Sequence, residues 1–191
     1  MRSLTPGVCS ITLLLAAFVV SAQTSAPKIV EHDAFSIIGI EVRTSGEAEF
    51  TREGEIAGLW QRFYRERILD KIPNRADQNV YALYTDYAHD RMGEYTVVIG
   101  AKVKDKTQAP AGMVLKTIPA GEYVVVTSEK GLGATVIPSA WQKVWALEDK
   151  DRLGGKRAYK ADFEVYGPAT DPQNLQADLY IGLKREASDQ K

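Results

Sequence analysis

Two stretches, Leu59-Trp60-Gln61-Arg62-Phe63-Tyr64 and Ala140-Trp141-Gln142-Lys143-Val144-Trp145, decide the fold of this chain. Each contains a Trp-Gln pair followed by a basic residue, and in each the apolar residues recur at helical spacing. A second pair of stretches, Glu94–Lys102 and Gln176–Lys184, aligns at almost the same separation along the chain. Such self-similarity indicates a duplicated unit. The sequence therefore predicts two similar halves that meet along a pseudo-twofold groove.

Each half repeats the same order of elements: a strand, a helix and two further strands. Alternating and β-branched runs predict the strands, and apolar residues three and four positions apart predict the helices. The first half is expected to hold strands over 28–42, 80–88 and 95–103 and a helix over 55–72. The second half is expected to hold one long extended element over 113–118 and 121–128, bent at Pro119-Ala120-Gly121, a helix over 139–148, and strands over 161–166 and 179–183.

This pattern predicts an α+β fold with duplicated β-α-β-β units. The strands would form one antiparallel sheet, with two helices over one face and a central groove. We expect a single domain over 28–185, made of two repeats at 28–103 and 113–185 and joined by a linker containing Pro110 and Gly112. About 160 residues are enough to bury one hydrophobic core.

The N-terminal segment, 1–22, has the pattern of a secretory signal peptide. Arg2 precedes an apolar stretch from Val8 to Val20, and Val20-Ser21-Ala22 offers a cleavage site. The stretch is shorter than the ~20 residues that cross a bilayer, so we expect no stable membrane anchor. The expected location is therefore periplasmic or secreted, with cleavage near Ala22. The alternative is a misassigned start upstream of a cytoplasmic protein.

Composition argues against several functional classes. The formal net charge is −1, so no electrostatic footprint predicts a nucleic-acid partner. The single cysteine, Cys9, lies inside the expected signal peptide, which excludes disulfides and thiolate chemistry from the mature chain. His32 and His89 do not stand at metal-ligand spacing with other donors, so we expect neither a metal nor a cofactor.

Aromatic residues and one acid are the candidate binding groups. Trp60, Trp141 and Trp145 fall on helices that pack on the same sheet, where they either fill the core or wall a pocket. An aromatic pocket holds cations at about 0.5–2 kcal/mol per contact. Strand alternation puts Asp162, Glu164 and Tyr166 on one face, although periodicity does not say which face meets the helices. The first half has Ala82 or Leu83 where the second has Glu164, and Val98 where the second has Tyr180.

Four runs resemble a known superfamily. They are Asn79–Tyr87, Gly93–Thr96, Ile118–Tyr123 and Lys160–Tyr166. These runs are similar to the effector-binding domain of bacterial transcription activators, within the gyrase-inhibitor-like small-molecule-binding superfamily, and in particular to its standalone integron-associated effector-binding proteins. The resemblance covers residues 28–183. It implies the duplicated fold already expected from the repeat.

The resemblance also implies a site and a ligand class. In such domains a buried acid on the strand after the second helix receives cationic, often aromatic, ligands, and Glu164 matches that acid. Aromatic walls are then expected from Trp141, Trp145, Tyr84, Tyr180 and Trp60. The expected function is an exported small-molecule-binding protein for amphipathic, cationic ligands.

Two other functions stay open at this point. Some members of the superfamily hydrolyse strained, cyclopropane-bearing electrophiles, and Glu164 would then act as a general base with Tyr180 positioning it. A protein-interaction module is the third possibility, because one relative inhibits a topoisomerase by binding it. The sequence does not predict the oligomeric state or the identity of the ligand.

Overall fold

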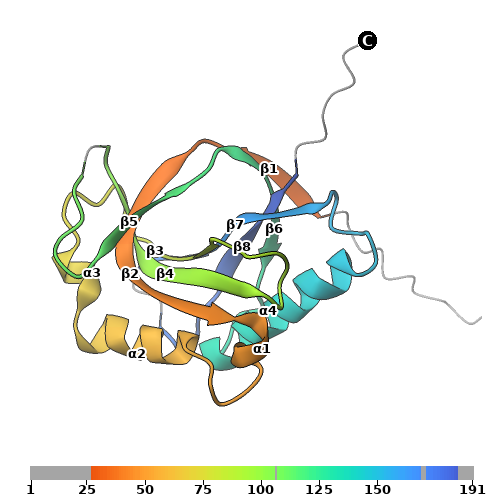
Figure 1. The fold of residues 1–191 in the computed structure, drawn as a ribbon, viewed down its shortest axis with the longest axis horizontal. Helices are drawn as coiled ribbons and strands as arrows, with labels where there is room; N and C mark the ends of the chain where they lie inside the picture. Colours follow the sequence, from red (N-terminus) through yellow and green to blue (C-terminus); the bar gives the residue numbers. More distant parts are fainter. Residues whose placement is uncertain (1–26, 106, 169–170, 185–191) are drawn as a thin grey trace, which may run out of the picture.

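The computed structural model in Figure 1 describes residues 27–105, 107–168 and 171–184. The strands of this part form one antiparallel sheet in the order β1-β6-β8-β7-β3-β4-β2-β5. Their bounds are β1 Lys28–His32, β2 Phe35–Ser45, β3 Val80–Thr85, β4 Glu94–Val103, β5 Val114–Ile118, β6 Gly121–Thr127, β7 Arg157–Tyr166 and β8 Ala177–Leu183.

The strand order carries the duplication. Exchanging β1 with β5, β2 with β6, β3 with β7 and β4 with β8 gives the same order read backwards. A pseudo-twofold axis therefore passes between β3 and β7, where the two halves pair. Ala82 and Glu164, which hold equivalent positions in the two halves, face each other there as register partners. The expected α+β fold of duplicated units in one antiparallel sheet is confirmed.

The two halves also exchange their outer strands. β1 runs on into β2 after two residues and pairs with β6 of the second half, whereas β5 runs on into β6 and pairs with β2 of the first half. The register is continuous, because His32 pairs with Gly121 and Phe35, three positions on, pairs with Ile118. One bent two-stranded ribbon thus connects both halves, and Figure 1 shows it arching over the curled sheet.

Four helices occur in the described part, all lying to one side in Figure 1. Short α1 falls between the strand expected over 28–42 and the helix expected over 55–72, where no element is expected. The helix expected over 55–72 is instead two helices, because Arg67 adopts a left-handed conformation with φ 51° and ends the first one. The second expected helix begins at Gly133 instead of near Ser139 and contains Pro138. The bounds are α1 Gly46–Glu49, α2 Ile56–Arg65, α3 Ile68–Lys71 and α4 Gly133–Glu148.

The sheet is buried on both faces. On one face, α2 and α4 pack through Leu59, Phe63 and Val144 onto alternate residues of the strands, which gives the larger core. On the other face, Phe35, Ile118 and Phe163 belong to a smaller core beneath the bent ribbon. The helix-covered face is therefore the one on which a groove between the halves can form.

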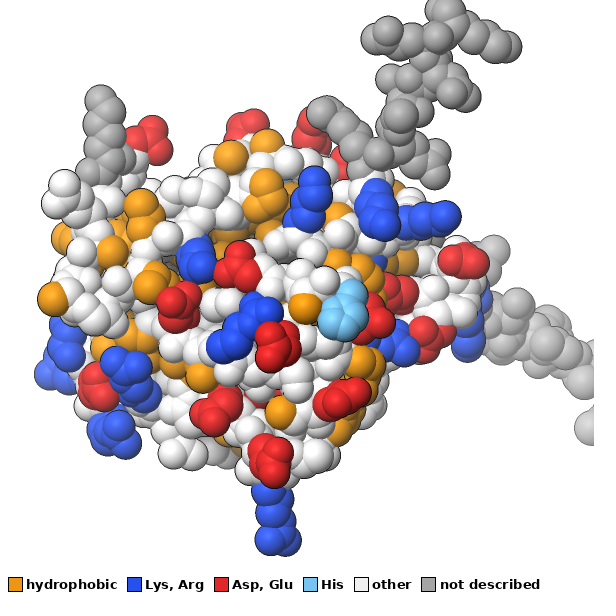
Figure 2. Space-filling model, viewed as in Figure 1, with side chains coloured by type: hydrophobic (Ala, Val, Ile, Leu, Met, Phe, Trp, Pro, Cys, Tyr) orange, Lys and Arg blue, Asp and Glu red, His pale blue; other side chains and the backbone are white. Residues whose placement is uncertain are grey.

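The outer surface carries mixed charge. In Figure 2 acidic and basic side chains are interspersed over the visible face instead of gathering by sign, in keeping with a net charge of −1. Within the described ranges, no helix is both long and apolar enough to cross a bilayer. The expected signal peptide, residues 1–22, lies outside the described residues.

Candidate functional site

A large cavity lies between the helix-covered face of the sheet and helices α2 and α4. Its volume is about 930 Å³, within the range of small-molecule sites. The lining is mainly apolar and aromatic. It includes Trp60, Trp141, Trp145, Tyr84, Tyr87, Tyr95, Ile137, Met92 and Phe50, with Glu49, Arg91, Arg157 and Glu164 as its charged members.

Glu164 lines this cavity and is completely buried. Its Oε1 accepts hydrogen bonds from the Tyr84 hydroxyl at 2.9 Å and from Trp141 Nε1 at 2.6 Å. Its Oε2 accepts one from the Tyr166 hydroxyl at 2.5 Å. The strands and α4 thus supply three neutral donors. Over the described residues, no lysine or arginine forms an ion pair with this carboxylate.

Burial dominates the electrostatics of this group. It raises the pKa of Glu164 above the ordinary value of 4.5, and the hydrogen bonds from Tyr166, Trp141 and Tyr84 only partly lower it again. The pKa values of Tyr84 and Tyr166 are also raised, first by burial and then by the neighbouring carboxylate. Both tyrosines therefore stay protonated as donors. An unpaired carboxylate in such surroundings is costly unless a cation approaches it.

The helices supply aromatic walls near the acid, as expected from the sequence. Trp60 of α2 packs edge-on against Tyr166 with ring centres 5.2 Å apart. Trp141 of α4 lies 5.0 Å from the Tyr84 ring and 6.4 Å from Trp145. All of these rings border the cavity. The structure thus brings Glu164 together with four of the five aromatic residues named from the sequence.

Tyr180 is the exception, and its expected place in the pocket is wrong. On β8 the register partner of Glu164 is Leu179, so Leu179 shares the helix-covered face and Tyr180 points to the opposite one. There the Tyr180 ring stacks on Phe163, with centres 4.5 Å apart and planes 5° apart. The hydrolase alternative thereby loses the residue assigned to position its base.

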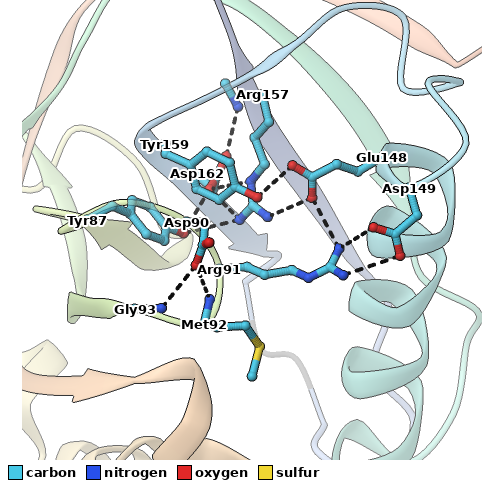
Figure 3. A network of polar contacts seen from close by, with 11 residues as sticks. Tyr87, Asp90, Arg91, Met92, Gly93, Glu148, Asp149, Arg157, Tyr159 and Asp162 are labelled. Carbon is cyan, nitrogen blue, oxygen red and sulfur yellow. Dashed lines mark hydrogen bonds and ion pairs between the residues drawn. The ribbon is translucent and has the colours of Figure 1, made fainter.

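A second polar centre borders the cavity around Arg157, shown in Figure 3. Arg157 donates to Asp162 Oδ2 from Nε at 3.1 Å and from Nη2 at 2.7 Å, and both side chains are almost completely buried. Asp162 also accepts the Tyr87 hydroxyl at 2.8 Å. Burial alone lowers the pKa of Arg157, but Asp162 and Tyr87 outweigh it, and the net shift is upward. The positive charge of Arg157 is therefore balanced by Asp162, within the protein itself.

The network continues to the end of α4. Glu148 lies 3.4 Å from Arg157 and accepts the Tyr159 hydroxyl at 2.6 Å. Arg91, in the β3–β4 connection, pairs with Asp149 at 2.9 Å (Figure 3). The carboxylates at the C-terminal end of α4, where the helix dipole disfavours negative charge, thus each meet an arginine.

A bulge in β7 makes this centre possible. Arg157 pairs with Leu183 and Asp162 with Ile181, so five steps along β7 correspond to two along β8. Within the bulge Tyr159 has φ 53°, a left-handed conformation that bulky residues rarely adopt. Its ring lies 4.5 Å from the Arg157 guanidinium. Nothing in the local sequence indicates this bulge, so Arg157 cannot be identified as a site residue from the sequence. Tyr166, by contrast, could have been named from its alternation with Glu164.

No group of three or more His, Cys, Asp or Glu residues within the described ranges is arranged to hold a metal ion.

Sequence comparisons identify relatives over most of the chain. YobU of Bacillus subtilis (strain 168), named as a transcriptional regulator, is 28% identical over 159 residues, which span 82% of this chain and 97% of YobU. The transcriptional regulator BrlR of Pseudomonas aeruginosa is 35% identical over 162 residues, again 82% of this chain. The match spans 54%, about half, of BrlR.

Structural comparisons find the same fold. An integron cassette protein from the mobile metagenome of Vibrio cholerae superposes with a TM-score of 0.63 at 25% identity, over 82% of this chain and 95% of that one. SAV2435, in a structure bound to tetraphenylphosphonium, gives 0.64 at 17% identity over 84% and 95%. The model of the integron-associated effector-binding protein family, Cass2, matches residues 28–183. The chain therefore belongs to the integron-associated effector-binding proteins, a family of small-molecule-binding domains.

Proposed function

We propose that this protein binds amphipathic, aromatic cations in the cavity between the sheet and helices α2 and α4, without converting them chemically. The observation that carries the proposal is Glu164: a fully buried carboxylate with three neutral donors and no ion-pair partner among the described residues. A lipophilic cation would supply the missing countercharge. A neutral or anionic ligand of the same shape would not.

The walls favour the same ligand class. Trp60, Trp141 and Trp145 present aromatic surface, which attracts cations and stacks on flat apolar groups. A cation loses its hydration when it enters this cavity. The rings and Glu164 would together compensate the lost hydration free energy. The fold neighbour SAV2435 has such a cation, tetraphenylphosphonium, as its bound ligand.

The decisive experiment uses two probes of one shape and opposite charge, tetraphenylphosphonium and tetraphenylborate. Binding is followed by quenching of tryptophan fluorescence and by calorimetry, with residues 23–191 as the protein. We expect the cation to bind at least about tenfold more tightly than the anion, a difference of about 1.4 kcal/mol. Equal affinity for both probes would refute charge recognition at this site.

We also propose that the mature chain acts outside the cytoplasm. The support is the order of Arg2, the apolar stretch from Val8 to Val20 and the small residues before Gln23. Expression of the full chain in a Gram-negative host, followed by fractionation and N-terminal sequencing, tests it. We expect a periplasmic product that begins near Gln23; an uncleaved cytoplasmic product contradicts the proposal.

A further inference from the structure

A second carboxylate, Glu49, lines the same cavity at the end of α1. Its Oε1 accepts the Thr44 hydroxyl at 2.6 Å and the backbone N–H groups of Glu55 and Ile56 at 2.8 and 3.3 Å. These bonds hold the side chain in place and satisfy backbone donors at the start of α2. Within the described part of the chain, Oε2 of Glu49 accepts no hydrogen bond and no basic side chain pairs with it.

The Tyr95 hydroxyl is a second group, besides Glu49, with unused hydrogen-bonding capacity. Tyr95 is only 7% exposed and lines the cavity, and its hydroxyl has no hydrogen-bond partner among the described residues. Every fully enclosed polar side-chain atom there does have a partner, so this hydroxyl must be reachable from the cavity. Tyr95 is the register partner of Thr44, which itself holds Glu49. The free hydroxyl therefore belongs to the Glu49 end of the cavity.

This end lies well away from Glu164. The strands β7, β3, β4 and β2 are consecutive in the sheet, so three interstrand spacings, about 14 Å, separate the strand of Glu164 from that of Thr44. One cavity thus contains a carboxylate near each end, and neither has a basic partner among the described residues. Aromatic rings line the space between them, since Tyr95 lies 6.0 Å from Tyr84 and Tyr87 5.4 Å from Tyr95.

We infer that the preferred ligands are elongated dications, with a lipophilic cationic group at Glu164 and a protonated amine at Glu49 and Tyr95. This inference rests on the proposed function and adds the second recognition point. Glu49 and Tyr95 both line the cavity, and Glu49 Oε2 and the Tyr95 oxygen are two acceptors without a partner among the described residues, which suits the several N–H donors of an ammonium group. A quaternary centre lacks such donors and gains less there.

Two probes that share one head isolate this contact: decyltriphenylphosphonium, and the same molecule with a terminal primary amine on the decyl chain. The measured quantity is the ratio of their dissociation constants for each variant. For the wild type we expect the amine to improve binding about tenfold, the size of one hydrogen bond to a charged group. Glu49→Gln should bring the ratio close to one, since Gln keeps an oxygen for the three bonds at Oε1 but removes the charge.

Further variants separate this inference from the proposed function. Tyr95→Phe should lower the ratio in part, and Glu47→Gln, an exposed acid on α1 that does not line this cavity, should leave it unchanged. Glu164→Gln should weaken both probes equally and keep the ratio. An undiminished ratio in Glu49→Gln overturns the inference while leaving the proposed function intact. Unchanged affinities of both probes in Glu164→Gln overturn the proposed function. Circular dichroism establishes that each variant is folded.

Discussion

Replacement of Glu164 by Gln is the sharpest test of the site, because the exchange changes charge but hardly changes shape. Tyr84 and Trp141 both donate to Oε1, which a Gln oxygen can replace. The Gln amino group would then face the Tyr166 hydroxyl, which can turn from donor to acceptor. The variant therefore keeps the local hydrogen bonds, and its effect on binding reports the charge.

The size of the effect follows from Coulomb's law. A ligand cation about 5 Å from the carboxylate, at an effective dielectric constant of about 20, gains about 3 kcal/mol. The dipole of the Gln side chain retains part of this, so we expect a loss of about 2–3 kcal/mol, or roughly 30-fold to 150-fold in Kd for tetraphenylphosphonium. Tryptophan fluorescence quenching measures it. A variant Kd within about twofold of the wild-type value would show that Glu164 is not the counter-ion.

Wild type and Glu164→Gln should also differ in how their stability and their affinity for the cation depend on pH. The pKa of Glu164 is raised in the folded protein, so the neutral carboxyl is favoured there. Protonation of Glu164 therefore stabilises the fold. This contribution to the free energy of unfolding is fully present below the unfolded pKa near 4.5 and is lost as pH rises through the folded pKa. The excess stability of Glu164→Gln over wild type should therefore grow with pH above about 4.5, measured by urea unfolding. Wild-type affinity for the cation should rise over the same interval, and that of the variant should stay flat. A parallel rise in both proteins would contradict this assignment.

Four further variants test other parts of the structure by urea unfolding. Tyr84→Phe removes a donor to the buried carboxylate and should lower the free energy of unfolding at neutral pH by about 1–3 kcal/mol. Tyr180→Phe, on the other face, should change it by less than about 0.5 kcal/mol and leave cation affinity unaltered; a weaker affinity would return Tyr180 to the site. Asp162→Asn leaves Arg157 buried without its main partner and should cost about 3–5 kcal/mol, whereas Asp149→Asn at an exposed pair should cost at most about 1 kcal/mol. Equal losses in these two Asn variants would refute the importance of burial.

The repeat and the periodicity were enough to predict the fold, because both depend on residues that recur along the chain. Paired aromatic helices, alternating strands and the bend near Pro119 all leave such local signals. Which face of each strand meets the helices was harder to predict. Alternation puts Glu164 and Tyr166 together, but only the pairing of Glu164 with Leu179 decides that Tyr180 points away.

Other parts of the site depend on contacts that no local pattern encodes. Arg157 reaches Asp162 through a bulge whose left-handed residue, Tyr159, is a poor candidate for that conformation. Glu49 lies between the first expected strand and the first expected helix, where the sequence predicts no element, and its place at the cavity follows from the short helix α1. Helix α4 begins five residues before Pro138, although proline usually lies in the first turn of a helix and not in its interior.

The pairing of Ala82 with Glu164 on the pseudo-twofold axis has a consequence for how such a site can arise. In a symmetric dimer of one unit, any acid at this position would face its own copy, with Cβ atoms about 5 Å apart. Two buried carboxylates so close could not both ionise, and the proton they shared would leave one negative charge divided between two positions. Joining both units in a single chain lets the two positions differ. One acid opposite a methyl group then concentrates its charge at a single position in an otherwise symmetric framework.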